Sequence, residues 1–298
     1  MNELVSIVIR TLNEDFYLDE LLTSIEKQNC DNFQKEVVII DSGSTDNTIK
    51  IAKKHKTRIT YIDKKNFTFG RSLNEGSDFA RGNTLVYISG HCIPCNVDWL
   101  EKLVRPILDG DYDYTYGKQV GRDTTKFSER QIFRKYFPSI SKIPQKDFFC
   151  NNANSALSKK CWQKYRFDEN ITGLEDMDLS KRLYEDNGRI AYISEAPVYH
   201  IHNETWKQTK RRYERESIAM QKIMPELQIN FRDMIRYIFA AILSDSARAI
   251  SEKVFINEFL SICKFRVAQF LGAFQGNHSH RALSKEKKEK YFYPTKKI

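Results

Sequence analysis

The sequence predicts an α/β fold, in which a mostly parallel sheet carries helices on both faces and a C-terminal helical region follows. Over roughly the first hundred residues, short runs rich in β-branched residues alternate with helical patterns, as they do in parallel sheets covered on both sides. From Lys207 onward, the apolar residues recur at helical spacing. We therefore expect a sheet domain over residues 1–215 and a helical region with a basic tail over residues 216–298.

The elements can be assigned in order along the chain. Strands are predicted at residues 5–9, 37–40, 59–62, 84–88 and 112–120. Helices are predicted at residues 18–25, 48–54 and 72–80, and after the alternation at residues 207–223, 231–250 and 252–272. Ligands of such sheets bind at the carboxyl ends of the strands, so the segments that directly follow the strands are the candidate site.

Composition narrows the classes of partner. The 298 residues are enough for one large domain with a core of its own, and the net charge of +9 favours anionic partners. Nucleotides, phosphates, acidic lipid headgroups and nucleic acid all fit that charge. The sequence has no glycine-rich dinucleotide fingerprint and no P-loop, and it has no aromatic and basic motif of an RNA-binding type. Neither an NAD enzyme, a P-loop ATPase nor a nucleic-acid partner is therefore expected.

Three features predict a cytoplasmic protein. No basic segment followed by an apolar stretch opens the sequence, so a secretory signal is not expected. No apolar run approaches the roughly 20 residues of a membrane span. The six cysteines are scattered, as expected of reduced thiols. Cys92 and Cys95 imitate a redox C-x-x-C pair, but the preceding elements do not fit that class, and we interpret both as ordinary thiols.

Polar turns follow the first two strands. The first turn offers Thr11, Asn13 and Glu14, and the second, "DSGSTD", begins at Asp41. A carboxylate at the end of a buried strand can accept a hydrogen bond from a nucleobase or a ribose hydroxyl, and Gly43 lets the backbone approach closely. The alternative is helix capping, for which these residue types are also favoured.

Longer motifs identify a family. The stretches "VSIVIRTLNEDFYLDELLTSI" and "EVVIIDSGSTDNTIKIA" resemble the opening of family 2 glycosyltransferases, which have the GT-A fold. The resemblance continues through "FTFGRSLNEGSDFARGNTLVYISGHCIP", "NNANSALSKKCW" and "GLEDMDLSKRL", and covers roughly residues 4–213. Rhamnosyltransferase-like enzymes of bacterial surface-polysaccharide synthesis, such as that of capsule or O-antigen, are the most similar subgroup. The resemblance implies inverting transfer of a sugar from a nucleotide-sugar donor to a glycan or lipid-linked acceptor.

The resemblance also implies roles for the turn residues. Thr11, Asn13 and Glu14 would line the nucleobase and ribose, and Asp41 would contact the base. Arg71 and Asn74, in "GRSLNEG", would lie beside the donor. Helix capping remains the alternative for Asn74, and a solvated surface charge the alternative for Arg71.

The catalytic base is expected in "GLEDMDLSKRL". Inverting transfer needs a carboxylate near the acceptor hydroxyl, and we expect Asp176 in that role with Glu175 orienting the acceptor. Adjacent carboxylates can raise each other's pKa. The alternative is plain placement of acids in the first turn of a helix, where the helix dipole favours them.

One expected pair of acids is missing. Family members usually carry Asp-x-Asp at the end of the strand over residues 84–88 and bind Mn²⁺ or Mg²⁺ there, but this chain has Ser89, Gly90 and His91. His91 and His202 together would hold a cation in one hypothesis. In the other, which we prefer because Mg²⁺ requires oxygen ligands, no metal is used, and His91 and the basic residues 207–212 neutralise the leaving diphosphate. An ordinary hydrogen-bonded histidine, and a catalytically silent relative that only binds nucleotide sugar or glycan, are the further alternatives.

The C-terminal helices have three possible roles. Apolar residues recur at helical spacing over residues 231–243. They would pack within the protein, lie on an anionic membrane at the cytoplasmic face of the inner membrane, or form a homodimer. A charge run over residues 285–290 ends this region.

Overall fold

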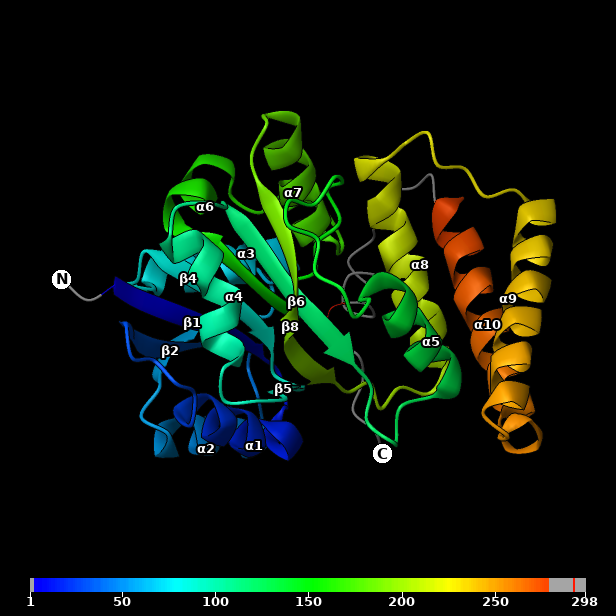
Figure 1. Ribbon diagram of the computed structural model, residues 1–298, viewed down its shortest axis with the longest axis horizontal. Helices are drawn as coiled ribbons and strands as arrows, with labels where there is room; N and C mark the ends of the chain where they lie inside the picture. Colours follow the sequence, from blue (N-terminus) through cyan, green and yellow to red (C-terminus); the bar gives the residue numbers. More distant parts are fainter. Residues whose placement is uncertain (1–2, 279–291, 293–298) are drawn as a thin grey trace. The chain divides into compact units, whose positions relative to one another are not determined.

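The β-branched runs of the sequence form the strands of one eight-stranded sheet (Figure 1). The computed structural model describes residues 3–278 and Phe292, so the charge run over residues 285–290 lies outside the described residues. The strand order is β3-β2-β1-β4-β7-β6-β8-β5. The bounds of the strands are β1 Glu3–Thr11, β2 Phe33–Asp41, β3 Arg58–Tyr61, β4 Thr84–Ser89, β5 Cys92–Pro94, β6 Tyr114–Val120, β7 Asn154–Ser158 and β8 Ile190–His200.

The sheet is mixed. Strands β1 to β4 pair in parallel, as predicted, and β6 pairs in parallel with β8. Strand β7 runs antiparallel to both β4 and β6, and β5 runs antiparallel to β8. The antiparallel strands escaped prediction because β5 and β7 are short and carry no turn signal that pairs them with a distant partner.

Helices cover both faces, as predicted. On β1, Val5, Ile7 and Ile9 pack into one apolar cluster with helices α1 (Asp15–Glu26) and α4 (Trp99–Leu108). Val8 points the other way, into a second cluster with α3 (Phe69–Phe79), α6 (Lys159–Tyr165) and α7 (Glu175–Glu185). This division follows from the two-residue period of a strand. A short helix, α2 (Thr48–Lys54), follows β2.

The described residues divide into two compact units. The sheet unit comprises residues 3–122, 133–170 and 175–201, and the helical unit comprises residues 123–132, 171–174 and 202–278 with Phe292. Each unit contains more than one stretch of chain, so no single sequence boundary describes them. The predicted division into a domain over residues 1–215 and a region over residues 216–298 concerns parts that fold independently, and it stays a prediction.

The helical unit contains the three predicted C-terminal helices, α8 (Trp206–Ile223), α9 (Phe231–Ser251) and α10 (Phe255–Asn277), and the start of α5 (Phe127–Tyr136). Capping boxes at Thr205 and Asn230 begin α8 and α9. Helices α8 and α10 pack closely, since a Cβ on Gly272 would lie 2.2 Å from Lys210 O. In the described part of the chain, no helix has the length and apolar character needed to cross a membrane.

Candidate active site

The candidate residues that end or follow β1, β2 and β4, namely Thr11, Asn13, Glu14, Asp41 and His91, lie at one edge of the sheet. Strands β1, β2 and β4 are parallel, so their carboxyl ends share an edge. Strand β7 begins at that edge because it runs antiparallel to β4, with Ile88 opposite Asn154. Ser89 N donates to Ala153 O at 3.4 Å, which joins the end of β4 to the segment before β7. The edge therefore combines the predicted turns with a segment, residues 151–153, to which sequence reasoning gave no role.

The first two turns are bonded to each other. Asp41 is buried, and its carboxylate accepts from Thr11 Oγ1 at 2.9 Å and from Ser44 N at 2.8 Å. Asn13 has a positive φ of 58°, and its Oδ1 accepts from Thr45 N at 2.9 Å. These side chains thus act first as a scaffold that fixes the shape of both turns.

Helix capping explains little of this pattern. Glu14 and Asn47, which stand at the N-caps of α1 and α2, make no side-chain capping bond. Asp46 alone behaves as the capping alternative requires, since its Oδ1 accepts from Thr48 N at 3.0 Å. The other polar residues of the two turns therefore need another explanation, which the cross-links between the turns supply.

His91 lies beside Glu14, at the end of β4. Its Nδ1 lies 3.2 Å from Glu14 Oε1, and its ring stacks on that of His200 with the centroids 5.3 Å apart. His200 Nδ1 is in turn 2.7 Å from Gln119 Oε1. The sheet unit therefore holds His91 between a carboxylate and a second imidazole. His200 stands two residues before His202 in the sequence, and no role was predicted for it.

His202 belongs to the helical unit. Its Nδ1 lies 2.8 Å from Glu129 Oε1, which also accepts from Arg212 Nη2 at 2.7 Å. Burial alone would raise the pKa of Glu129, but the charges of His202 and Arg212 lower it to about 2. Arg212 also pairs with Glu204 at 3.0 Å. Two carboxylates thus already compensate Arg212, which weakens its predicted part in neutralising a diphosphate.

Glu129 carries no signal in the sequence that would have found it. It stands in a polar helical segment, α5, far along the chain from His202. His91 and His202, the pair expected to share a cation, are described in different units.

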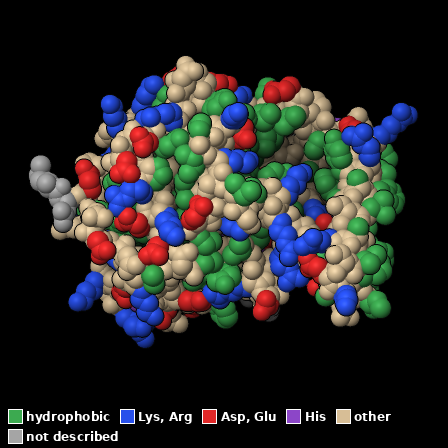
Figure 2. All heavy atoms as spheres, viewed as in Figure 1, with side chains coloured by type: hydrophobic (Ala, Val, Ile, Leu, Met, Phe, Trp, Pro, Cys, Tyr) green, Lys and Arg blue, Asp and Glu red, His purple; other side chains and the backbone are tan. Residues whose placement is uncertain are grey.

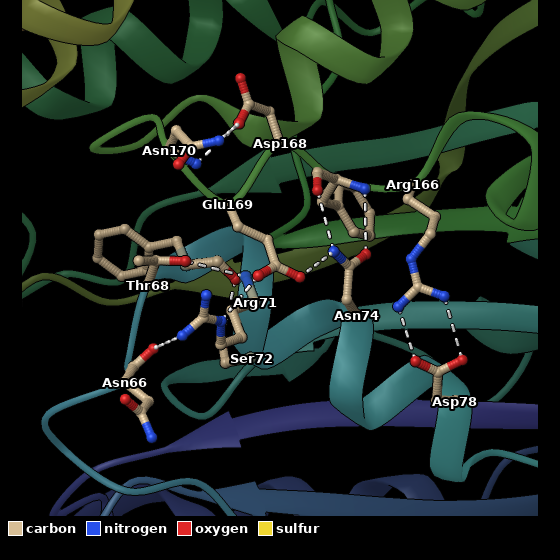
Figure 3. A network of polar contacts seen from close by, with 12 residues as sticks. Asn66, Thr68, Arg71, Ser72, Asn74, Asp78, Arg166, Asp168, Glu169 and Asn170 are labelled. Atoms are coloured by element: carbon tan, nitrogen blue, oxygen red, sulfur yellow. Dashed lines mark hydrogen bonds and ion pairs between the residues drawn. The ribbon is translucent and has the colours of Figure 1, made fainter.

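Arg71 and Asn74 lie in a network that joins α3 to the segment before α7 (Figure 3). Arg71 Nε donates to Glu169 Oε2 at 2.7 Å. Asn74 is buried; its Nδ2 donates to Phe167 O and Glu169 Oε1, and its Oδ1 accepts from Trp162 Nε1 and from Phe167 N. Arg71 is therefore an ion-paired residue, and Asn74 uses both of its N–H bonds and its oxygen within the protein. Capping of α3 falls to Thr68, which accepts from Arg71 N.

Glu175 and Asp176 begin α7 and are buried, with exposed fractions of 5% and 7%. Asp176 Oδ2 accepts from Asn152 N at 2.7 Å, and Oδ1 accepts from Met177 N at 2.8 Å. Burial and the neighbouring charge of Glu175 raise the pKa of Asp176 to about 7, although these two N–H groups and Arg10 oppose the shift. A carboxyl group with that pKa can take and release a proton near neutral pH, which is the requirement for a general base.

The cysteine pair Cys92 and Cys95, at the start of β5 and directly after its end, shows no sign of redox chemistry. Cys92 is fully buried, and burial raises the pKa of its thiol well above the usual value. Burial also raises the pKa of Cys95, to about 11. Reactive cysteines need a lowered pKa, so the interpretation as ordinary thiols fits both residues.

Known proteins that resemble this chain in sequence are glycosyltransferases, as the motifs predict. The family model described as "Glycosyl transferase family 2" matches residues 6–166, more than half of the chain. An O-antigen chain rhamnosyltransferase of Salmonella typhimurium is 24% identical over 222 residues, which cover 70% of each chain. One of Salmonella anatum is 28% identical over 213 residues, or 65% of each chain.

Solved structures share the fold. A mannosyltransferase from Pyrobaculum calidifontis, solved with GDP-Man and Mn²⁺, has a TM-score of 0.66 at 13% identity and covers 93% of this chain and 88% of its own. Residues 1–349 of Staphylococcus aureus TarS give 0.53 at 16% identity, with 93% of each chain covered. These likenesses confirm the predicted GT-A-like α/β fold. The chain belongs to glycosyl transferase family 2 and is a nucleotide-sugar-dependent glycosyltransferase.

Proposed function

We propose that this enzyme moves a sugar, with inversion, from a nucleotide-sugar donor to a hydroxyl of a glycan or lipid-linked saccharide during assembly of a bacterial surface polysaccharide. The observation that carries the proposal is Asp176, a buried carboxyl group whose pKa is raised to about 7 and whose two oxygens are held by backbone N–H groups. A silent relative has no need of such a group, because an ordinary ionised aspartate would serve a binding site equally well.

The proposed reaction uses Asp176 as the general base. Its carboxylate takes the proton of the acceptor hydroxyl while the acceptor oxygen bonds to the anomeric carbon and the bond from that carbon to the diphosphate breaks. Glu175 orients the acceptor, and Arg10, 3.3 Å from Glu175 Oε1, holds Glu175 in place. O-antigen rhamnosyltransferases among the relatives support the choice of a surface glycan as product.

The proposed nucleotide site is the joined pair of turns. Its shape is defined by the bond between Thr11 and Asp41 and by the bond between Asn13 and Thr45. Glu14 and His91 keep 23% and 29% of their side chains exposed, so they remain available for the ribose and the diphosphate. Arg71 and Asn74 are proposed to lie beside the donor, as residues that fix the neighbouring wall.

A divalent cation fits this donor set poorly. The Asp-x-Asp carboxylates are replaced, and His91 and His202 offer imidazole nitrogen, whereas Mg²⁺ requires oxygen ligands and Mn²⁺ prefers them. A bound cation would supply positive charge at the leaving diphosphate. We propose instead that His91 donates a hydrogen bond to that diphosphate, and a Mn²⁺ site at His91 and His202 remains the competing hypothesis.

The proposed membrane contact is a face of α9 and α10. Large apolar side chains are exposed along it, among them Phe239 at 62%, Leu243 at 69% and Leu260 at 69%. Figure 2 shows apolar side chains gathered on the surface of α9. Exposed basic residues accompany them, namely Arg232 and Arg236 on α9, Lys264 on α10 and Lys253 in the connection between the two helices. We propose that this face lies on anionic lipid at the cytoplasmic side of the inner membrane, with a homodimer contact as the competing use.

The test of the enzymatic proposal is release of nucleotide. The purified chain is mixed with UDP-, dTDP- and GDP-sugars, with and without p-nitrophenyl glycosides as acceptors, and both free nucleotide and the glycosylated product are measured. We expect one nucleotide class to be turned over, and its release to depend on Asp176. Calorimetric binding of a nucleotide sugar without turnover of any donor would support the silent relative.

A further inference from the structure

A buried amide lies beside the proposed base. Asn152 lies two residues before the start of β7 and is 5% exposed. Its backbone N–H donates to Asp176 Oδ2 at 2.7 Å. Asn152 is therefore in direct contact with the proposed base, and neither the sequence motifs nor the proposed reaction gives its side chain a role.

Two hydroxyl groups fix the orientation of this amide. Asn152 Oδ1 accepts from Tyr114 OH at 2.6 Å and from Ser155 Oγ at 2.7 Å. Both partners are fully buried, at 0% exposure. With the oxygen held on that side, the Nδ2 group is directed away from Tyr114 and Ser155.

Asn152 Nδ2 has no hydrogen-bond partner among the described residues, although it is buried. A buried donor left unpaired is unfavourable, because it has lost its water without replacement. The other buried asparagines of the sheet unit do not share this condition. Asn154 Nδ2 donates to Lys118 O and Ala196 O, and Asn74 is paired on both its nitrogen and its oxygen.

We propose that Asn152 is a saccharide-binding residue, whose Nδ2 donates to a sugar hydroxyl at the position next to Asp176. This inference rests on the proposed function, since it assumes that a saccharide reaches Asp176. The recognised chemistry is a hydroxyl group, which both the transferred sugar and the acceptor sugar carry. Binding supplies the missing partner, so a saccharide that lacks this hydroxyl is disfavoured by the unpaired N–H that remains.

The test replaces the donor group and keeps the shape. Asn152→Asp retains an oxygen for Tyr114 and Ser155 and exchanges Nδ2 for an oxygen. The first arm measures calorimetric affinity for UDP, dTDP and GDP and for their sugars, and uses the ratio between each sugar nucleotide and its diphosphate. The added charge affects both ligands, so it largely cancels in the ratio. Ser155→Ala is the matched control, because it removes one bond that holds the amide and leaves Nδ2 unchanged.

The second arm separates the two sugars. If Nδ2 binds the transferred sugar, Asn152→Asp lowers the ratio by about 2- to 13-fold and Ser155→Ala preserves it. If Nδ2 binds the acceptor, the ratio and the hydrolysis of the donor by water stay at the wild-type values, while KM for a p-nitrophenyl glycoside rises by a similar factor. Either result supports the proposal.

Wild-type values in both arms, with unchanged thermal unfolding, would overturn it. So would an equal loss of affinity for diphosphate and sugar nucleotide together with an unchanged KM for the p-nitrophenyl glycoside, because that pattern indicates only the added charge or a structural role. The binding arm needs no turnover. A wild-type chain that binds sugar nucleotides but transfers nothing therefore contradicts the proposed function, and the affinity ratio still tests whether Asn152 binds the transferred sugar. A chain that binds none contradicts both proposals.

Discussion

Arg10 Nη1 lies 3.3 Å from Glu175 Oε1, and this ion pair joins the end of β1 to the start of α7. The two residues are 165 positions apart in the sequence, yet the pair is largely buried. The ion pair holds the Glu175 side chain beside Asp176. Burial is the first cause of the raised pKa of Asp176, and the charge of Glu175 is the second. The acidity of the proposed base therefore depends on the fold of the whole sheet unit.

Replacing the base gives the first prediction. Asp176→Asn keeps the size of the side chain and one oxygen, which can accept from only one of the two N–H groups, those of Asn152 and Met177, and it removes the proton acceptor. We expect transfer to slow by about 10²- to 10⁴-fold while donor binding, measured by calorimetry, is retained. Asp178→Asn is the control, since Asp178 lies in the same helical turn and pairs with Arg182. Transfer at the parental rate by Asp176→Asn would remove Asp176 from the mechanism.

The second prediction is the pH dependence. Asp176 must be ionised to act as a base, so transfer should rise about tenfold per pH unit below pH 7 and level off above it. Glu175→Gln removes the charge that helps to raise this pKa, and the rising limb should move to lower pH. The measurement is the rate of nucleotide release from pH 5 to 9 for both proteins. If the rate rises over the same pH range in the wild type and in Glu175→Gln, the proposed electrostatic coupling between Glu175 and Asp176 is contradicted.

The same carboxyl group links stability to pH. Its pKa is about 3.8 when unperturbed and about 7 in the folded protein, so between these values the folded chain holds a proton that the unfolded chain has released. The contribution to stability is therefore full below pH 4 and is lost as the pH rises through 7. Thermal unfolding at pH 5 and pH 8 should show that Asp176→Asn gains stability relative to wild type at the higher pH.

Much of this fold follows from local sequence patterns. The parallel strands, the helices on both faces and the three C-terminal helices end within a few residues of their expected positions. The third C-terminal helix begins at Phe255 rather than residue 252 because Lys253 has a positive φ of 58°, which a helix excludes. Such a backbone conformation in a lysine has no sequence signal.

The side-chain partners of the site follow from the sequence far less. Asp41, Asn13 and Asn74 were expected to face a ligand, yet their bonds go to other parts of the chain. Polar residues at strand ends can serve a ligand or the loops that surround it, and a single sequence does not separate the two uses. Asn152 was missed for the converse reason, since only an unpaired atom in three dimensions distinguishes it from the paired Asn154.

The scaffold role of Asp41 gives the third prediction. Asp41→Ala removes an acceptor of hydrogen bonds from Thr11 Oγ1 and from the N–H groups of Gly43 and Ser44. We expect nucleotide affinity to fall by an amount equivalent to about 1.5–3 kcal/mol, together with a lower unfolding temperature. Asp147→Ala, which removes an exposed turn acceptor of Phe149 N, is the matched control. Unchanged calorimetric affinity in a folded Asp41→Ala protein would exclude Asp41 from the nucleotide site.

The fourth prediction concerns the exposed face of α9 and α10. The chain should bind vesicles that contain phosphatidylglycerol better than vesicles of phosphatidylcholine alone, and added salt should weaken the binding. The double variant Leu243→Glu, Leu260→Glu should lose binding, because it places two charges in the apolar face. Ile140→Glu is the control, since Ile140 is 80% exposed in the sheet unit. The face would instead be a dimer interface if the wild-type protein binds neither kind of vesicle and forms a dimer, and if the double variant is a monomer.

The last prediction decides the role of His91. With no Asp-x-Asp carboxylates at the end of β4, we expect nucleotide release to continue in EDTA at nearly the rate seen without it. His91→Ala should slow release by about 10²- to 10³-fold, which is the usual effect of removing one hydrogen-bond donor from a developing negative charge. His55→Ala, which alters a histidine at the end of α2 that pairs with Asp19 and Glu26, should leave the rate unchanged. Activity abolished by EDTA and restored by Mn²⁺, with Mn²⁺ binding that His91→Ala and His202→Ala each weaken in paramagnetic resonance titrations, would establish the competing metal site instead.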